Sequence, residues 1–317
     1  MLSVEERLQE ASSSEDDFLT EITQHLLRAG GKRFRPLLAQ IAAELGTPGD
    51  RRPVEAGVAV ELIHVGSLYH DDVIDEADAR RGSASANANW DNTVAILAGD
   101  YLMARASEVA ATYLGQESVR LLAATYAELV EGQTRELQLD FDTNHGPDAY
   151  YKVIEGKTAS LIRTSARLGA IAADCPEHVV EAVSTWAWEL GVVFQIADDA
   201  LDLVASDEYL GKPAGSDIGE GKFTLPVLYA LEGPDGAKVR ELLESSRPYD
   251  RATIDAVIAI CREGGHVAAA LDEAAHRLEV AANAIADVGD PDTRTVLTRM
   301  GSFLIEQVEY ARSVDQA

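Results

Sequence analysis

The sequence predicts an all-α protein built as a single large helical bundle. Aromatic residues make up only 6% of the 317 residues, and Ala, Leu and Glu are abundant, which favours helices over sheets. No proline occurs between Val54 and Gly146, so this stretch can hold several long helices. With 46% hydrophobic residues, the chain can also bury a sizeable core. We therefore expect one domain over residues 1–317.

Apolar residues along the chain recur at helical spacing. Val58, Leu62 and Val65 follow an i, i+4, i+7 pattern that continues at Leu68, whereas strand-like alternation is almost absent. Short breaks that contain Gly or Pro separate the helical segments at residues 46–50, 144–147, 174–176, 210–213, 232–236, 247–248 and 289–291. The pattern predicts about ten or more helices joined by short connections.

One longer stretch, residues 207–222, is predicted to be irregular. It contains Pro213 and several glycines, at positions 211, 215, 219 and 221. Such a composition is typical of a mobile loop whose residues suit contacts with phosphate.

The charge balance argues against several kinds of partner. The formal net charge is −27, and a protein this acidic is a poor ligand for nucleic acid or for an anionic membrane surface. The 27 basic residues nevertheless fall partly into tight groups, which indicate local sites for anions.

Cysteine usage and hydropathy suggest a cytoplasmic protein. Cys175 and Cys261 are the only cysteines, too few for a disulfide framework or a Cys-rich metal motif. The first residues lack the apolar run of a signal peptide, and no uncharged apolar run is long enough to span a bilayer. We therefore expect no stable membrane insertion.

The first cluster of chemically suggestive residues is Asp71, Asp72 and Asp75. In a helix these side chains share one face, and their like charges repel one another. A hard divalent cation would offset that cost. The alternative is a solvated acidic face, but the turns upstream of the cluster are apolar and the cluster is repeated later in the chain.

The repeat is Asp198, Asp199 and Asp202, at the same spacing and again after an apolar run. Both clusters offer only carboxylate oxygens, with no His or Cys. This ligand type points to Mg²⁺, which keeps several waters and is commonly completed by substrate phosphates.

Basic islands accompany the acidic clusters. Lys32 and Arg35 follow a Gly-Gly turn that lets backbone and cations close on an anion, although a plain helix stop and start is the alternative. His64 lies on nearly the same helix face as Asp71, where a lone histidine is usually a satisfied core residue. Lys157 sits in a Gly-Lys-Thr sequence, but the rest of a nucleotide P-loop is missing, so only a phosphate contact is expected there.

Taken together, these motifs resemble those of trans-isoprenyl diphosphate synthases, the polyprenyl synthetase family. Their order and spacing match over residues 30–231. The matching motifs are Gly30-Gly31-Lys32-Arg33-Phe34-Arg35-Pro36, Glu61-Leu62-Ile63-His64, Asp71-Asp72-Val73-Ile74-Asp75, Arg80-Arg81-Gly82, Gly99-Asp100, Gly156-Lys157-Thr158, Phe194-Gln195, Asp198-Asp199-Ala200-Leu201-Asp202, Gly211-Lys212 and Gly221-Lys222-Phe223-Thr224-Leu225-Pro226.

The resemblance implies a bundle of the isoprenoid synthase type with a central active-site cavity, and a homodimer. It implies head-to-tail condensation of isopentenyl diphosphate with an allylic diphosphate held through several Mg²⁺ ions. Asp71, Asp72, Asp75, Asp198, Asp199 and Asp202 would serve the metals; Arg80, Lys157, Gln195, Lys212 and Lys222 would hold the allylic diphosphate; Lys32, Arg35, His64 and Arg81 would hold isopentenyl diphosphate. Lys157, Thr158 and Gln195 would lie near the reacting carbon, and the released diphosphate would accept the final proton.

The size of the residues about one turn before Asp71 is expected to limit the length of the product. In the family an aromatic residue there blocks the tail of a growing product, but this chain has Gly66 and Ser67. We therefore expect a medium-to-long all-trans product. The alternative is a short product, farnesyl or geranylgeranyl diphosphate, with a floor formed deeper, by Ile63 or by residues 94–103.

Two further functions compete with this interpretation. A class I terpene cyclase is also helical and magnesium-dependent, but it usually pairs one Asp-rich motif with an Asn/Ser/Glu motif. A non-catalytic partner subunit would have lost its Asp motifs, which are both intact here. The chain also lacks the basic C-terminal tail that helps to close the site in short-chain members, which leaves closure to the loop with Lys212 and Lys222.

Overall fold

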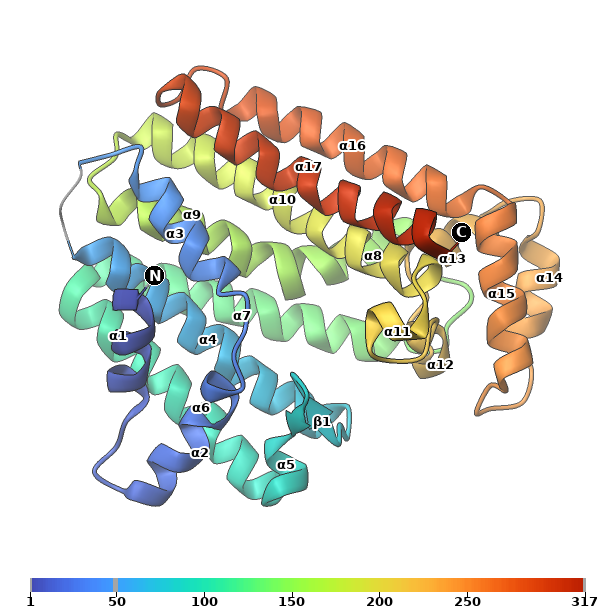
Figure 1. Cartoon of the computed structure of the whole chain (residues 1–317), viewed down its shortest axis with the longest axis horizontal. Helices are drawn as coiled ribbons and strands as arrows, with labels where there is room; N and C mark the ends of the chain where they lie inside the picture. The colour runs from blue at the N-terminus through green and yellow to red at the C-terminus, as the bar shows by residue number, and fades with distance from the viewer. Residues whose placement is uncertain (1, 48–50, 316–317) are drawn as a thin grey trace. The chain divides into compact units, whose positions relative to one another are not determined.

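The computed structural model describes residues 2–47 and 51–315, and it confirms the predicted all-α class (Figure 1). The chain divides into two compact units, which are described separately below. Unit 1 comprises residues 1–127 and 161–184, and unit 2 comprises residues 128–160 and 185–317.

Unit 1 is organised around one long central helix, α4 (Arg52–Ile74). It packs against α1 (Leu2–Ser12), α3 (Phe34–Ala43) and α6 (Asn92–Val109), and it is buried on nearly all sides. The unit also contains α2 (Asp17–Arg28), α5 (Ala86–Asn89), η1 (Ala110–Leu114), the first half of α7 (Gln116–Leu139), most of α9 (Ser160–Ala172) and the start of α10 (Glu177–Val204).

Close helix packing in unit 1 depends on small residues. A Cβ at Gly66 of α4 would lie 3.1 Å from the carbonyl oxygen of Gly99 in α6. A Cβ at Gly169 of α9 would lie 2.0 Å from the carbonyl oxygen of Ala39 in α3. At Gly169 the neighbouring backbone leaves no room for a side chain, so glycine is required there. At Gly66 the two helices meet so closely that an added Cβ would push its neighbours by a few tenths of an ångström.

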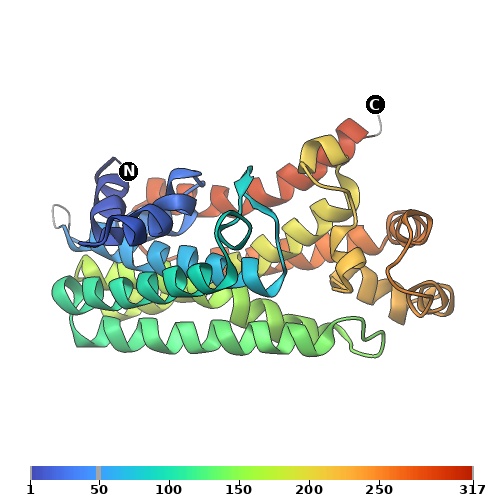
Figure 2. The ribbon, with the colours of Figure 1, turned by 90° about the horizontal axis from the view of Figure 1, so that it is seen from below.

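The core of unit 2 surrounds the second half of α10. The fully buried Val192 and Ile196 belong to one hydrophobic cluster that also takes residues from α13 (Leu225–Glu232), α15 (Arg251–Glu263), α16 (His266–Ala284) and α17 (Pro291–Asp315). The other elements are the end of α7, α8 (Pro147–Ile154), η2 (Glu155–Ala159), α11 (Asp207–Leu210), α12 (Ser216–Glu220) and α14 (Gly236–Leu243). Helices α14 and α15 pack on each other, and both are seen nearly end-on in Figure 2.

The structure corrects the expectation for residues 207–222. This stretch is not simply irregular, because it contains the short helices α11 and α12. The hydroxyl of Ser206 accepts a hydrogen bond from the backbone N–H of Tyr209 and so caps α11. Gly211 and Gly221 end the two helices in the left-handed conformation that glycine adopts without strain.

A two-stranded hairpin was not predicted. Strand β1 (Ala79–Arg80) pairs antiparallel with β2 (Ser83–Ala84). The two linking residues, Arg81 and Gly82, have φ angles of 54° and 75°, as a tight hairpin turn requires.

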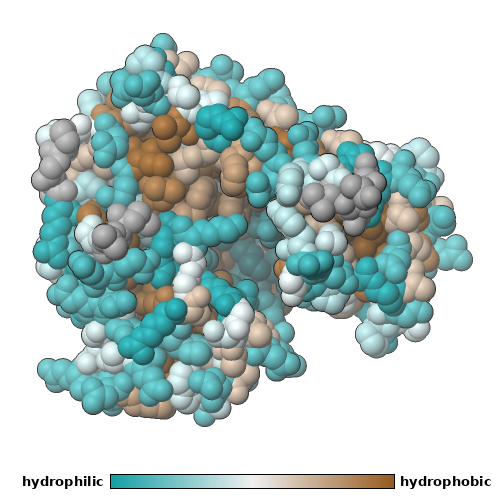
Figure 3. Space-filling model, viewed as in Figure 1, coloured by the Kyte–Doolittle hydropathy of each residue, from teal (hydrophilic) through white to brown (hydrophobic). Residues whose placement is uncertain are grey.

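The surface agrees with the acidic composition. Hydrophilic residues cover most of the face shown in Figure 3, and hydrophobic residues gather there in a few patches. Within residues 2–47 and 51–315, no helix combines the length and the hydrophobicity that crossing a bilayer requires.

Candidate active site

The first acidic motif ends helix α4 in unit 1. Asp72 is fully buried, Asp71 is half-buried and Asp75 is exposed. The Oδ1 atom of Asp72 accepts a hydrogen bond from Nε of Arg80 at 2.6 Å, whereas its buried Oδ2 atom has no partner. Burial raises the pKa of Asp72 although Arg80 opposes the shift. A buried carboxylate oxygen without a donor is well suited to bind a cation.

The hairpin places two arginines that are adjacent in sequence in different surroundings. Arg80 reaches Asp72, whereas Nη1 of Arg81 donates hydrogen bonds to the carbonyl oxygens of Leu26, at 3.1 Å, and of Gly30. A Cβ at Gly31 would lie 2.9 Å from Nη1 of Arg81. The Gly-Gly turn therefore gives Arg81 the space to enter.

A cation-rich group lies around Glu61 of unit 1. The charges of Arg35, Arg33 and Arg81 all act on the Glu61 carboxylate, yet burial outweighs them and raises its pKa. Nη1 of Arg33 lies 3.2 Å from Glu61 and also bonds the carbonyl oxygen of Gly30, which ties this acid to the Gly-Gly turn. Glu61 therefore partly neutralises a group of arginines that would otherwise repel one another.

Three of the four residues predicted to hold isopentenyl diphosphate belong to this group. The Nε atom of Arg35 is buried without a hydrogen-bond partner, and burial lowers the pKa of Arg35 to about 10. Burial and the charges of Arg35 and Arg81 hold the pKa of His64 well below its usual value. Lys32 follows the same Gly-Gly turn but is exposed. Among the predicted cations, Arg35 therefore has one buried donor atom without a hydrogen-bond partner.

The predicted chain-length residues lie on the buried face of α4. Ile63 is 4% exposed and Ser67 is 7% exposed, and the Ser67 hydroxyl donates to the His64 carbonyl. Gly66 faces α6, where an added Cβ would meet the Met103 side chain at 3.0 Å. Tyr69 is fully buried, and its hydroxyl donates to the carbonyl of Ile22 in α2. Tyr69 therefore points away from these positions, as helical phase predicts.

The second acidic motif lies in unit 2, on α10. Asp198 is exposed, and Asp199 is only 3% exposed. The two oxygens of Asp199 accept hydrogen bonds from Oη of Tyr150 at 2.6 Å and from Nε2 of Gln195 at 2.8 Å. Burial raises the pKa of Asp199 well above its usual value, and the charges of Asp217 and Asp198 add to the shift.

Asp202, the third acid of the motif, anchors the following loop. It is 2% exposed and accepts hydrogen bonds from the Ser216 hydroxyl at 2.9 Å and from the Asp217 backbone N–H at 3.2 Å. Nζ of Lys212 lies 3.1 Å from its Oδ1 atom. Burial and the charge of Asp202 raise the pKa of Asp217 to about 7. Lys222, the second predicted cation of the loop, forms an ion pair with Glu220 at 2.8 Å.

The segment with Lys157 approaches α7 closely. A Cβ at Gly132 would lie 2.5 Å from the backbone nitrogen of Lys157, so only glycine fits at this contact. Lys157 forms an ion pair with Glu136 of α7. Thr158 donates a hydrogen bond to Oε1 of Gln195 at 2.9 Å. Unit 2 thus joins Lys157, Thr158 and Gln195 to the second acidic motif.

Sequence patterns did not identify several residues of these sites. Tyr150 lies seven residues before Lys157, but its bond to Asp199 joins residues 49 positions apart. Asp217 had a visible signal, since it is an acid between two loop lysines. Glu61 stood in a matching motif, three residues before His64, but no role was assigned to it. No sequence signal marked Glu136, because it is one of many acidic residues on a largely exposed helix.

The donor chemistry fits Mg²⁺, although no complete cage is preformed. Within the described part of the chain, no three His, Cys, Asp or Glu side chains converge in the manner of a metal site. Mg²⁺ does not need such a cage, because it is typically held by one or two carboxylates together with water and substrate phosphate. The unpartnered Oδ2 atom of Asp72 and the exposed Asp198 supply carboxylates of that kind.

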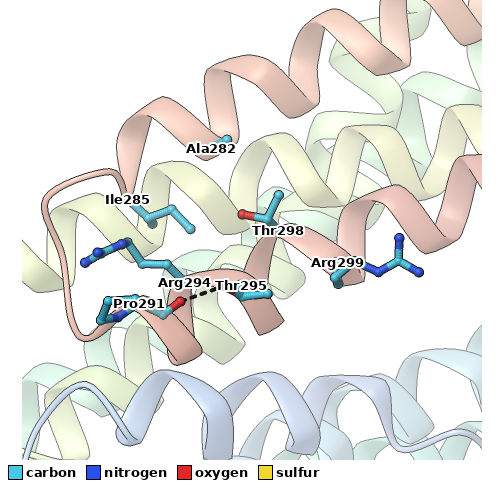
Figure 4. A pocket seen from close by; sticks show the side chains of 7 residues that line it. All are labelled: Ala282, Ile285, Pro291, Arg294, Thr295, Thr298 and Arg299. Atoms are coloured by element: carbon cyan, nitrogen blue, oxygen red, sulfur yellow. Dashed lines mark hydrogen bonds between the residues drawn. The ribbon is translucent and has the colours of Figure 1, made fainter.

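A surface pocket of about 460 Å³ between α16 and α17 holds none of the predicted site residues (Figure 4). Its lining residues are Ala282, Ile285, Pro291, Arg294, Thr295, Thr298 and Arg299. Arg294 donates to the carbonyls of Val288 and Gly289, and Arg299 pairs with Glu306. Both guanidinium groups are therefore bound within the protein.

The half-buried His64, whose pKa is lowered, predicts a pH-dependent stability. Because the pKa of His64 is lowered in the folded protein, only the unfolded chain takes up this proton as the pH falls below the ordinary histidine pKa. The folded wild type should therefore lose stability relative to His64→Gln as the pH falls from 7 to 5, by at most about 1.4 kcal/mol per pH unit. Calorimetric melting of the two proteins measures the difference. His276→Gln, on the exposed surface of α16, is the control, and parallel profiles for wild type and His64→Gln would contradict the assignment.

Comparisons with known proteins identify the family. The model of the polyprenyl synthetase family matches residues 16–261. The chain is 41% identical to the nonaprenyl diphosphate synthase of Mycobacterium tuberculosis over 295 residues, covering 92% of this chain and 88% of the relative. It is 44% identical to heptaprenyl diphosphate synthase component 2 of Geobacillus stearothermophilus over 231 residues, covering 73% of this chain and 72% of the relative. The solved geranylgeranyl pyrophosphate synthase of Corynebacterium glutamicum, complexed with calcium and isoprenyl diphosphate, superposes with a TM-score of 0.85 at 40% identity and covers 97% of this chain and 95% of that one. On this evidence, the chain belongs to the polyprenyl synthetase family.

Proposed function

We propose that this chain is a magnesium-dependent prenyltransferase that condenses isopentenyl diphosphate head to tail with an allylic diphosphate. The product is an all-trans polyprenyl diphosphate of medium-to-long chain. The observation that supports the proposal is that unit 1 contains two clusters of charged residues with different chemistry. One combines the carboxylates of the first motif with Arg80, and the other gathers Arg35, Arg81 and His64 without a predicted metal ligand.

Two such sites suit two diphosphates that are held in different ways. A diphosphate with bound Mg²⁺ favours carboxylates, whereas a metal-free diphosphate favours arginine, whose planar donors match phosphate oxygens. The allylic substrate therefore belongs at the acidic site and isopentenyl diphosphate at the cationic site. A class I cyclase has a single diphosphate to bind and has no use for the second site.

The acidic motifs of both units act on the same allylic diphosphate in this proposal, so residues 1–317 form one catalytic domain. Asp71, Asp72, Asp75, Asp198, Asp199 and Asp202 are the candidate metal ligands. When bound, Mg²⁺ would neutralise charge on the departing diphosphate. The exposed Asp198 and the free oxygen of Asp72 are the best-placed of these ligands.

The protein's cations and polar groups have separate tasks. Arg80, Lys157, Gln195, Lys212 and Lys222 hold the allylic diphosphate and stabilise its charge as the C–O bond breaks. Lys32, Arg35, His64 and Arg81 orient isopentenyl diphosphate so that its double bond attacks the allylic carbon. Thr158 and Gln195 stabilise the positive charge on that carbon, and the released diphosphate accepts the final proton.

Turnover of acid-deleted variants tests the metal assignment. Asp71→Ala and Asp198→Ala should each cut the rate of condensation by orders of magnitude, because the allylic diphosphate loses a metal ligand. Melting temperature and circular dichroism should stay close to wild type. Asp148→Ala, which removes an exposed acid at the start of α8, controls for the loss of charge. Near-normal turnover in either motif variant would sink the assignment.

The proposed product length rests on Gly66 and Ser67. Both residues are small and buried on α4 about one turn before the first motif. Gly66 faces the close crossing with α6, so Ser67 is the position at which bulk would limit a growing tail. Two relatives with at least 41% identity are named for nonaprenyl and heptaprenyl products. The alternative is a short-chain enzyme, which a relative named for geranylgeranyl pyrophosphate, at 40% identity, keeps open.

Enlarging Ser67 tests the product length. Ser67→Phe should shorten the main product, because a ring at this buried position takes the space that the tail occupies. Ser67→Ala should leave the product distribution unchanged. Chromatography of labelled products, with melting curves to verify folding, gives the answer. If folded Ser67→Phe makes the wild-type product, the tail runs elsewhere and the short-chain alternative gains support.

We further propose that the enzyme is a cytoplasmic homodimer. Both cysteines are free thiols, as expected in a reducing compartment. Helix α6 exposes Ile96 and Leu97, which are 43% and 58% accessible, and α7 exposes Val130 and Leu137 at 45% and 49%. Such apolar side chains on long helices favour burial against a second subunit.

The α6 surface gives a test of the dimer. Leu97→Glu should convert the dimer into monomer, because it places a charge in an apolar contact. Sedimentation equilibrium measures the mass. Phe303→Glu is the matched control, since this residue is 54% exposed on α17, outside the proposed contact, and the variant should stay dimeric. A dimeric Leu97→Glu protein, or a monomeric wild type, would rule out this interface.

A further inference from the structure

Tyr150 of α8 is buried against the second acidic motif, although its type and position match no part of that motif. Its side chain is 5% exposed, and its hydroxyl donates to Oδ2 of Asp199 at 2.6 Å. Burial raises the pKa of Tyr150 well above its usual value, and the negative charge of Asp199 adds to the shift. The hydroxyl is therefore a buried donor to Asp199.

Asp199 also accepts a hydrogen bond from Gln195 and so links Tyr150 to this residue. Its other oxygen accepts from Nε2 of Gln195, one turn earlier on the same helix, at 2.8 Å. Oε1 of Gln195 accepts from the Thr158 hydroxyl at 2.9 Å. Each end of the amide therefore meets a partner of the correct polarity, and only one orientation of the amide satisfies both bonds.

A neutral donor is required at this place for electrostatic reasons. Asp199 lies beside Asp198 and Asp217, whose charges disfavour its ionised form. A carboxylate this deeply buried needs hydrogen-bond donors, because burial removes the water that would otherwise bond its oxygens. A lysine or arginine would supply a donor, but its charge would compete with the cations that the neighbouring carboxylates attract. Tyrosine supplies the bond without the charge.

We propose that Tyr150 is a positioning residue, which acts through Asp199 to hold the Gln195 amide and the Thr158 hydroxyl in one fixed arrangement. This inference rests on the proposed function, in which Gln195 and Thr158 lie beside the reacting allylic carbon. The π-helical turn η2, residues 155–159, presents Thr158 to Gln195, and π-helical turns are frequent at functional sites. Tyr150 thus contributes to the chemical step without touching substrate.

Tyr150→Phe removes the hydroxyl and keeps the ring. The proposal expects kcat to fall roughly 10- to 100-fold, as for one lost buried bond to a charged group. The KM for either substrate should change less than about threefold, because Tyr150 contacts no substrate.

The neighbouring Tyr151 provides a matched control. Its ring packs on Tyr150 with centroids 5.6 Å apart, but the group that acts most on its hydroxyl is Tyr229 and not Asp199. Tyr151→Phe deletes the same atom from the same helix and should keep the wild-type kcat. Melting temperatures of the two variants should fall by similar amounts, so a loss of kcat in Tyr150→Phe alone cannot be a stability effect.

A double-mutant cycle identifies the route of the effect. If Tyr150 acts through Gln195, then Tyr150→Phe with Gln195→Ala should be no slower than Gln195→Ala alone. Additive losses, a wild-type kcat in Tyr150→Phe, or an equal loss in Tyr151→Phe would each overturn the positioning role. The wild type is assayed first. If it does not condense the two substrates, the proposed function is wrong. If it does and Tyr150→Phe has the same kcat, only the positioning role is wrong.

Discussion

The need to compensate buried carboxylates shapes both candidate sites. A carboxylate out of water is costly unless a cation or hydrogen-bond donors surround it. The chain has a net charge of −27, so basic residues are scarce, and those beside buried acids form ion pairs with them. The pairs and donors that meet this need are Arg7 and Arg51 on Glu55, Arg33 on Glu61, Arg80 on Asp72, Tyr150 and Gln195 on Asp199, and Lys212 and Ser216 on Asp202.

The acids of the two motifs differ in their burial and in the donors that surround them. Asp202 is enclosed by donors from the following loop and so fixes the loop that carries Lys212. Asp72 keeps one oxygen without a partner, and Asp198 is exposed. Identical sequence motifs therefore contain carboxylates with different tasks, and burial decides which task each one has.

The helical class and the positions of both acidic motifs could be predicted because they depend on local patterns. Apolar spacing along α4 and the repeated Asp spacing are both visible within a few turns of chain. The hairpin at Arg81 and Gly82 was missed because a two-residue turn carries little signal amid helices. Tyr150 and Glu136 were missed for another reason: their roles come from partners 49 and 21 residues away in the chain, and only packing brings those together. The short helices in residues 207–222 were not predicted, because the glycines that end them also indicate an irregular loop.

The central claim is that the acids of both units serve one diphosphate. A crystal structure of the wild type with Mg²⁺, isopentenyl diphosphate and an unreactive allylic thiodiphosphate tests it most directly. The account predicts that Asp71 and Asp198 would both help to hold Mg²⁺ on the same allylic diphosphate, while Arg35 and Arg81 would contact isopentenyl diphosphate without metal. An allylic diphosphate whose ions are bound by only one of the two motifs would contradict it.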